Sequence, residues 1–176
     1  LKTRYELDKI IFVGDRGMIT QSNAEALKDD EDLHTITALT HGAMVQLLER
    51  KVIEIDLFDE RQIHEVIDPQ APDKRYCLCR NPVSAQRETA TRERLLTLTE
   101  QGLDQIAQYK QKTTVEVLGA RVGKLLAKYK MGKFVHWRIQ ADPTEVKSNQ
   151  HQLHWHFDTE KIVQEQRFDG CYIITT

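Results

Sequence analysis

The apolar positions at the start of the chain predict two strands with a helix between them. The run over 10–13 (Ile-Ile-Phe-Val) is continuous rather than alternating, which is typical of a central strand covered on both faces. Residues 34–39 have the β-branched content of a second strand. A helix over about 22–30 would complete a βαβ unit, in which the two strands are parallel.

The pattern then changes to a mixture of helix and strand. Residues 42–50 predict a helix, and 52–80 read as β-like with acids interleaved among the apolar positions. Asn81 followed by proline is a strong helix start, since Asn caps and proline suits the first helical position. The helix that follows is highly charged and extends to about Lys110, with a break expected near Gly102.

The last third of the chain predicts a further helix and a pair of strands. Residues 115–129 place apolar side chains on one helix face. Residues 134–140 and 152–157 alternate cleanly, which predicts antiparallel strands with one apolar face each. A short helix over 159–166 and a final strand over 171–175 complete a mixed α/β fold.

Composition and charge narrow the class of protein. Hydrophobic residues make up 40% and charged residues 30%, which fits a globular protein, and no apolar run approaches the roughly 20 residues of a membrane helix. Three cysteines make no disulfide framework, so we expect reduced thiols in a cytoplasmic protein. The net charge of −2 hides an acidic first part and a basic stretch over 110–138, which has eight basic residues and one acid.

The candidate metal ligand is Asp15, which directly follows the first predicted strand and stands between Gly14 and Gly17. Ligands of α/β sheets bind at the carboxyl ends of the strands. A carboxylate there can hold Mg²⁺, and two such ions activate a nucleophile in phosphoryl transfer. A single Asp cannot build that site, so on chemistry alone a plain turn residue is the favoured interpretation.

Three blocks of sequence together resemble the DDE transposases of bacterial insertion sequences. The first is Ile-Phe-Val-Gly-Asp-Arg-Gly-Met-Ile-Thr over 11–20, and the second is Arg-Tyr-Cys-Leu-Cys-Arg-Asn-Pro over 75–82. The third is Arg-Phe-Asp-Gly-Cys-Tyr-Ile-Ile-Thr-Thr over 167–176. The resemblance implies an RNase H-like catalytic fold that cuts and joins DNA ends with two Mg²⁺ (or Mn²⁺) ions. In that pattern Asp15 is the middle catalytic acid and a metal ligand.

The same resemblance implies a domain organisation. Residues 1–41 would be part of the RNase H-like core, with the central strand ending at Asp15. Residues 42–166 would be an insertion domain of helices and antiparallel strands, and 167–176 a strand returning to the core. The first Asp and the last Glu would lie outside the chain, which would then be a central fragment that is inactive alone. The implied partners are transposon ends and target DNA at the nucleoid, with a possible homo-oligomer and no membrane.

The basic stretch supplies candidate contacts to DNA. Lysine and arginine neutralise phosphates, and the absence of a base-reading motif points to contacts with the backbone. Arg121, Lys124 and Lys128 are spaced to share one helix face. The full set of candidates is Lys110, Lys112, Arg121, Lys124, Lys128, Lys130, Lys133 and Arg138.

Other interpretations stay open at this point. The chain could be a non-catalytic DNA-binding module, or another two-metal nuclease or phosphatase of similar fold. His151, His154 and His156 could contribute to a zinc site. An exposed polar strand face explains them more simply, with His136 at the corresponding position of the neighbouring strand.

Overall fold

The structure is a computed structural model that describes residues 2–15, 32–108, 113–141 and 151–176. The chain divides into two compact units. The first unit contains residues 1–85 and 170–176, and the second contains residues 86–169. No helix among the described residues is long and apolar enough to cross a membrane.

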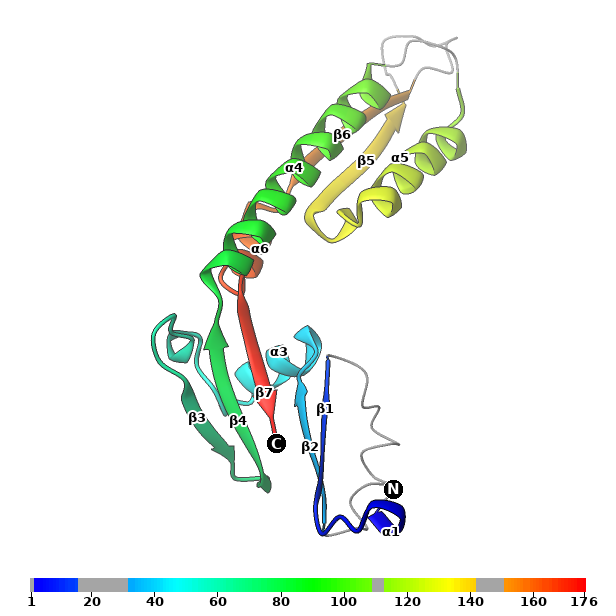
Figure 1. The fold of residues 1–176 in the computed structure, drawn as a ribbon. Coiled ribbons are helices and arrows are strands. Elements are labelled where there is room, and N and C mark those ends of the chain that lie inside the picture. The colour runs from blue at the N-terminus through cyan, green and yellow to red at the C-terminus, as the bar shows by residue number, and fades with distance from the viewer. Residues whose placement is uncertain (1, 16–31, 109–112, 142–150) are drawn as a thin grey trace. The chain divides into compact units, whose positions relative to one another are not determined.

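The first unit is built on a five-stranded mixed sheet with the order β1-β2-β7-β4-β3 (Figure 1). β1 pairs with β2 in parallel, and the remaining neighbours are all antiparallel. The mixed α/β class is therefore confirmed, and so is the parallel pair expected from the βαβ pattern. The strands are β1 (Ile10–Gly14), β2 (Leu33–Ala38), β3 (His64–Asp68), β4 (Ala71–Arg80) and β7 (Cys171–Thr175).

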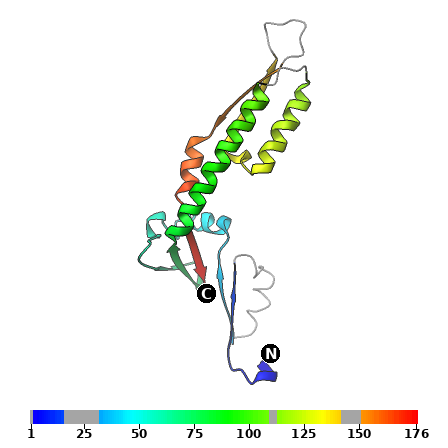
Figure 2. The same ribbon diagram turned by 45° about the horizontal axis from the view of Figure 1, so that its top comes forward.

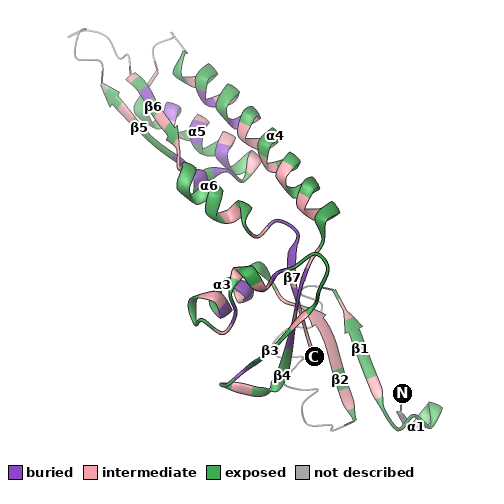
Figure 3. Ribbon diagram, turned by 90° about the vertical axis from the view of Figure 1, so that its left-hand side faces the viewer, coloured by how far each residue is buried: buried purple, intermediate pink, exposed green. Residues whose placement is uncertain are grey.

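The position of β1 differs from the expected one. It is an edge strand of the sheet formed by the described residues, not a central strand. Ile11 is 55% exposed and Val13 75%, so side chains on the apolar run lack the cover that its pattern predicts (Figure 3). The predicted helix over 22–30 lies outside the described residues.

The connection between β2 and β3 is more helical than predicted. After the short helix α1 (Lys2–Tyr5) near the start of the chain, the next described helix is α3 (His41–Glu49), which confirms the helix predicted there. The strand expected from alternation in the fifties is wrong, because Ile55–Leu57 forms a 3₁₀ turn, η1. Ile53 and Phe58 are buried on either side of that turn. The alternating apolar residues in this segment therefore belong to a 3₁₀ turn with a buried residue on each side, and not to a strand.

An ion pair joins the end of α3 to the turn between β3 and β4. The Asp68 carboxylate is almost fully buried and accepts hydrogen bonds from Arg50 Nη2 at 2.9 and 2.7 Å. The backbone N–H of Gln70 also donates to it at 2.9 Å. These bonds, the Gln70 one first, hold the pKa of Asp68 below its ordinary value.

The second unit contains most of a long helix, α4 (Pro82–Ala107), which begins in the first unit. Asn81 caps it as predicted, because its side-chain oxygen accepts from the N–H groups of Val83 and Ser84. The expected break near Gly102 is absent from this helix. A Cβ at Gly102 would lie 2.6 Å from Leu125 Cδ1, so the glycine serves helix packing.

Two helices and a hairpin enclose the core of the second unit. α5 (Val115–Tyr129) runs beside α4, and the hairpin is formed by β5 (Val135–Ala141) and β6 (His151–Phe157) (Figure 2). The predicted helix and antiparallel strands are confirmed. The remaining elements are η2 (Gly132–Phe134) and α6 (Thr159–Gln166). The buried cluster at the centre consists of Leu103, Val122, Leu126, Val135 and Leu153.

The boundaries of the units differ from the domain boundaries implied by the transposase resemblance. Residues 42–85 lie in the same compact unit as β1 and β2, although the resemblance assigned them to the insertion. The strand expected to return over 167–176 is β7, which pairs with β2 and β4 in the first unit. The boundaries between the units fall at 85/86 and 169/170, within α4 and just before β7.

Candidate functional site

Asp15 lies where the sequence places it, directly after β1 and exposed. Thr37 of the neighbouring strand donates its hydroxyl to the Asp15 backbone carbonyl at 3.4 Å, which ties the end of β1 to β2. The carboxylate is a hard oxygen ligand of the kind that Mg²⁺ prefers.

The described residues do not complete a metal site of three ligands around it. Among them no group of three or more His, Cys, Asp or Glu side chains could hold a metal ion. Asp56, Asp59 and Glu60 are exposed side chains. Asp169 has a structural role: its carboxylate is buried, accepts from the Thr89 hydroxyl at 2.7 Å and pairs with an arginine of α4, Arg92.

The three blocks that resemble the transposases come together in one sheet. β1 contains residues 11–14 of the first block, whose residues 16–20 lie outside the described part of the chain, while β4 carries most of the second block and β7 most of the third. β7 lies between β2 and β4, and its register opposes Arg80 to Cys171 and Leu78 to Ile173. Segments about 90 residues apart in sequence are therefore direct neighbours in the first unit (Figure 1).

The basic candidates do not form one surface. Lys110 and Lys112 lie outside the described residues. Arg121, Lys124 and Lys128 lie together, as their spacing predicts, along a groove between α4 and α5. The floor of that groove includes Ile106 and Leu125. Three cations beside an apolar floor can hold an anionic partner, with charge at the rim and hydrocarbon beneath.

Lys130 and Lys133 belong to a different hollow, near the end of α5. Lys130 ends α5 in the left-handed conformation, with φ of 56°. Lys133 pairs with Glu165 of α6, and its ammonium group lies 4.9 Å from the centre of the Phe134 ring. The ion pair offsets part of the charge that Lys133 would present to a phosphate.

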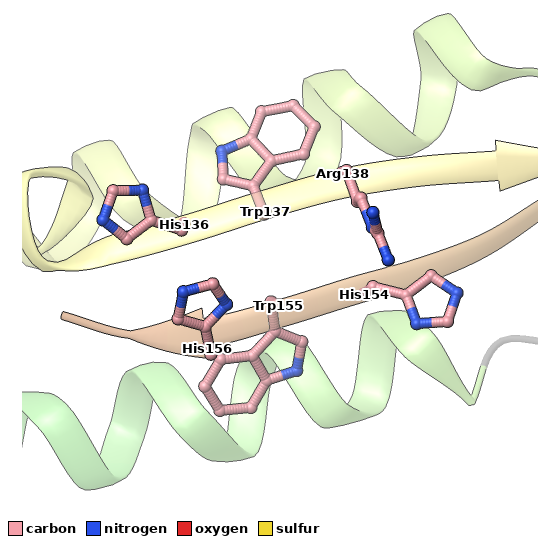
Figure 4. A pocket seen from close by; sticks show the side chains of 6 residues that line it. All are labelled: His136, Trp137, Arg138, His154, Trp155 and His156. Carbon is pink, nitrogen blue, oxygen red and sulfur yellow. The ribbon is translucent and has the colours of Figure 1, made fainter.

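Arg138 belongs to a third location, the outward face of the β5–β6 hairpin. The register opposes Arg138 to His154 and His136 to His156, with the rings of the two histidines stacked 5.2 Å apart. Figure 4 shows the four side chains on adjacent strands, with Arg138 reaching toward β6. The sequence predicted a polar face here but not this cross-strand pairing, which depends on the register.

The register also separates the three histidines considered for zinc. His151 lies on the inward face of the hairpin, the same face as Leu153. Its Nδ1 is buried without a hydrogen-bond partner. His154 and His156 point outward and are exposed. The three therefore cannot share one tetrahedral ion, because a strand directs odd and even positions to opposite faces.

An acid stands at one end of the outward face. The His136 Nε2 lies 3.3 Å from the Asp158 Oδ2. Asp158 also caps α6 by accepting from the Lys161 N–H at 3.0 Å. The Lys161 N–H first, and then His136, hold the pKa of Asp158 below its ordinary value.

All three cysteines lie in the described part of the chain as thiols rather than as disulfides, as expected. Cys79 and Cys171 are buried, and Cys77 is partly buried. Burial raises the pKa of the Cys79 thiol above its ordinary value, which makes it a poor nucleophile at neutral pH. These residues serve packing of the sheet.

Comparisons with protein-family models, with curated proteins and with solved structures found no match to this chain.

Proposed function

We propose that this chain is the central part of a DDE transposase, which catalyses metal-dependent cleavage and transfer of DNA strands. The observation that carries the proposal is the meeting of the three blocks in one sheet. Blocks with a shared origin in a catalytic core are expected to remain neighbours after an insertion between them, and here 84 residues of a separate unit lie between β4 and β7.

The edge position of β1 supports the same proposal. Its apolar side chains are those of a strand covered on both faces, yet several are exposed in this chain. In the intact transposase, further strands of an RNase H-like core would pair with the free edge of β1, and helices of that core would cover its faces. The first unit would then be half of that core together with the base of the insertion.

The residues present fit a metal only in part. Asp15 would be one ligand of Mg²⁺ or Mn²⁺, and an Asp and a Glu from outside the chain would be the others. Bound ions would activate the attacking oxygen and stabilise the leaving oxygen. Asp15 contributes a charged oxygen at a fixed strand end, held by the Thr37 hydrogen bond to its backbone. The chain alone would be inactive, with cytoplasmic location at the nucleoid as the matching expectation.

The test is an Asp15→Ala substitution in the intact transposase. We expect DNA strand cleavage to fall on the order of 10³-fold or more, because metal carboxylates act as a unit. Folding should be unchanged, since Asp15 is exposed. The matched control is Asp56→Ala, another exposed aspartate of the first unit, which should cleave normally. Cleavage retained by Asp15→Ala would reject the proposed role.

A second candidate function is a non-catalytic DNA-binding module. The observation that favours it is the row of Arg121, Lys124 and Lys128 along one groove. The reading frame of the parent protein separates the two candidates. An upstream Asp and a downstream Glu would support the transposase, and their absence would leave the binding module.

A further inference from the structure

The outward face of the β5–β6 hairpin is a surface whose charge depends on protonation. Six side chains point outward from the two strands: His136, Arg138, Gln140, Gln152, His154 and His156. All six are exposed, and none is acidic. The face therefore carries one permanent cation at neutral pH and up to three more when the imidazoles are protonated.

We propose that this face binds the phosphate backbone of DNA, and that protonation of His154 and His156 strengthens the binding. The inference rests on the proposed function for the identity of the partner. It adds a surface distinct from the α5 groove and a dependence on pH that the groove cations, which stay charged, would not give.

The geometry favours an extended polyanion. Opposed side chains on neighbouring strands lie about 5 Å apart, and alternate side chains along one strand about 6.8 Å apart. The pairs His136–His156 and Arg138–His154 therefore form a two-by-two array of nitrogen donors (Figure 4). The array borders a hollow of about 380 Å³, whose lining also includes Trp137 and Trp155, the residues between the array positions on each strand. Phosphate oxygens accept from such donors, and charge makes those bonds stronger.

The charged groups around the array decide which histidines matter. His136 faces Asp158, which offsets its charge when it is protonated. His156 faces the His136 ring, and His154 is opposed by Arg138. A phosphate bound across the array accepts hydrogen bonds from the imidazoles, and its negative charge favours their protonated form. Binding and protonation of His154 and His156 are therefore linked.

The test measures the affinity of the 176-residue chain for a fluorescently labelled DNA duplex by anisotropy. Between about pH 8 and about pH 5.5 we expect affinity at low salt to rise about tenfold or more, as the imidazoles gain charge. The plot of log affinity against log salt should become steeper by about 2, because two further phosphates are neutralised.

Variants assign that gain to the face. H154Q/H156Q should lose most of the rise in affinity at low pH, whereas H34Q, which removes an exposed histidine of β2, should keep it. H154K/H156K should bind tightly at both pH values, since lysine stays charged. Arg138→Gln should weaken binding at both pH values and reduce the salt slope by about 0.9. Emission from the hairpin tryptophans checks that each variant is folded.

Two results would overturn the proposal: an unchanged rise in H154Q/H156Q, or no binding by the wild-type chain at low pH and low salt. Either leaves the transposase proposal standing, because that is judged by cleavage in the Asp15→Ala protein. Conversely, full cleavage by Asp15→Ala would reject the transposase mechanism and leave the binding result intact.

Discussion

The strand β1 and the β5–β6 hairpin differ in how far their apolar side chains are buried. In the hairpin, alternate residues such as Val135 and Leu153 are buried against α4 and α5, while their neighbours face outward. In β1 the run is continuously apolar, and Ile11 and Val13 are more than half exposed. Residues of its own unit cover the apolar side chains of the hairpin. The described residues leave Ile11 and Val13 of β1 without such cover, although β1 pairs with β2.

The difference shows what each pattern encodes. Alternation specifies one buried face, and two helices of the same unit are enough to cover it. A continuous run specifies cover on both faces of a strand within a larger sheet. The second unit therefore covers the apolar face of its own hairpin, whereas the apolar side chains of β1 remain partly exposed in the first unit. The proposed catalytic acid, Asp15, follows the edge strand β1, whereas the proposed DNA-binding surface is the outward face of the β5–β6 hairpin.

The largest expected effect comes from Leu103→Ala. Leu103 is fully buried in the cluster of the second unit, so the substitution should lower the free energy of unfolding by about 2–5 kcal/mol. Both tryptophans of the chain, Trp137 and Trp155, lie on the hairpin, so their emission in a urea titration reports unfolding of this unit.

The matched control is Ile11→Ala on β1. Because Ile11 is half exposed, its truncation should cost less than about 1 kcal/mol, measured by hydrogen exchange in the first unit. A cost equal to that of Leu103→Ala would show that β1 is covered, and it would remove the contrast between the two regions.

The next effect concerns the turn into β7. Gly170 has φ of +71°, and a Cβ there would lie 2.4 Å from the Asn81 carbonyl oxygen. Gly170→Ala should destabilise the first unit by about 1–3 kcal/mol, since the left-handed backbone is strained for alanine. Gly42→Ala is the control, because Gly42 lies in α3 with open space around it. That change should be neutral or stabilise by up to about 1 kcal/mol.

A melting experiment on both proteins by circular dichroism checks this pair. If Gly170→Ala has the same melting temperature as the wild type, the backbone near Asn81 and Gly170 can adjust to the added methyl group. The pairing of β4 with β7, which joins the second and third blocks, is then less rigid than its register indicates.

Sequence patterns predicted local elements well and their environments less well. The Asn81 cap, the parallel β1–β2 pair and the hairpin followed from residue types and spacing. The continuity of α4 through Gly102 could not be predicted in this way. The glycine packs against Leu125, which lies on another helix more than 20 residues away in sequence. Proximity along a strand grouped His151 with His154, although pleating separates their faces. Likewise, the basic stretch looked continuous in sequence, yet helix and hairpin divide it between separate surfaces.

The smallest effect tests the acid that borders the hairpin face. The pKa of Asp158 is lowered in the folded protein, so its stabilising contribution is present above the carboxyl's ordinary pKa of 3.8. That contribution is lost as the pH falls through the lowered value, because protonation removes the charge-assisted bonds to Lys161 and His136. Asp158→Asn keeps an oxygen for the cap but no charge, so its deficit should be smaller than that of Gly170→Ala.

Urea titrations followed by tryptophan emission, at about pH 7 and about pH 3, measure that deficit. We expect Asp158→Asn to be less stable than the wild type at the higher pH, with a smaller deficit at the lower pH. An equal deficit at both values would mean that Asp158 acts through the neutral cap alone. The pairing with His136 would then contribute nothing to stability. His136 would be as available to phosphate as His154 and His156, which would extend the proton-dependent surface to the whole two-by-two array.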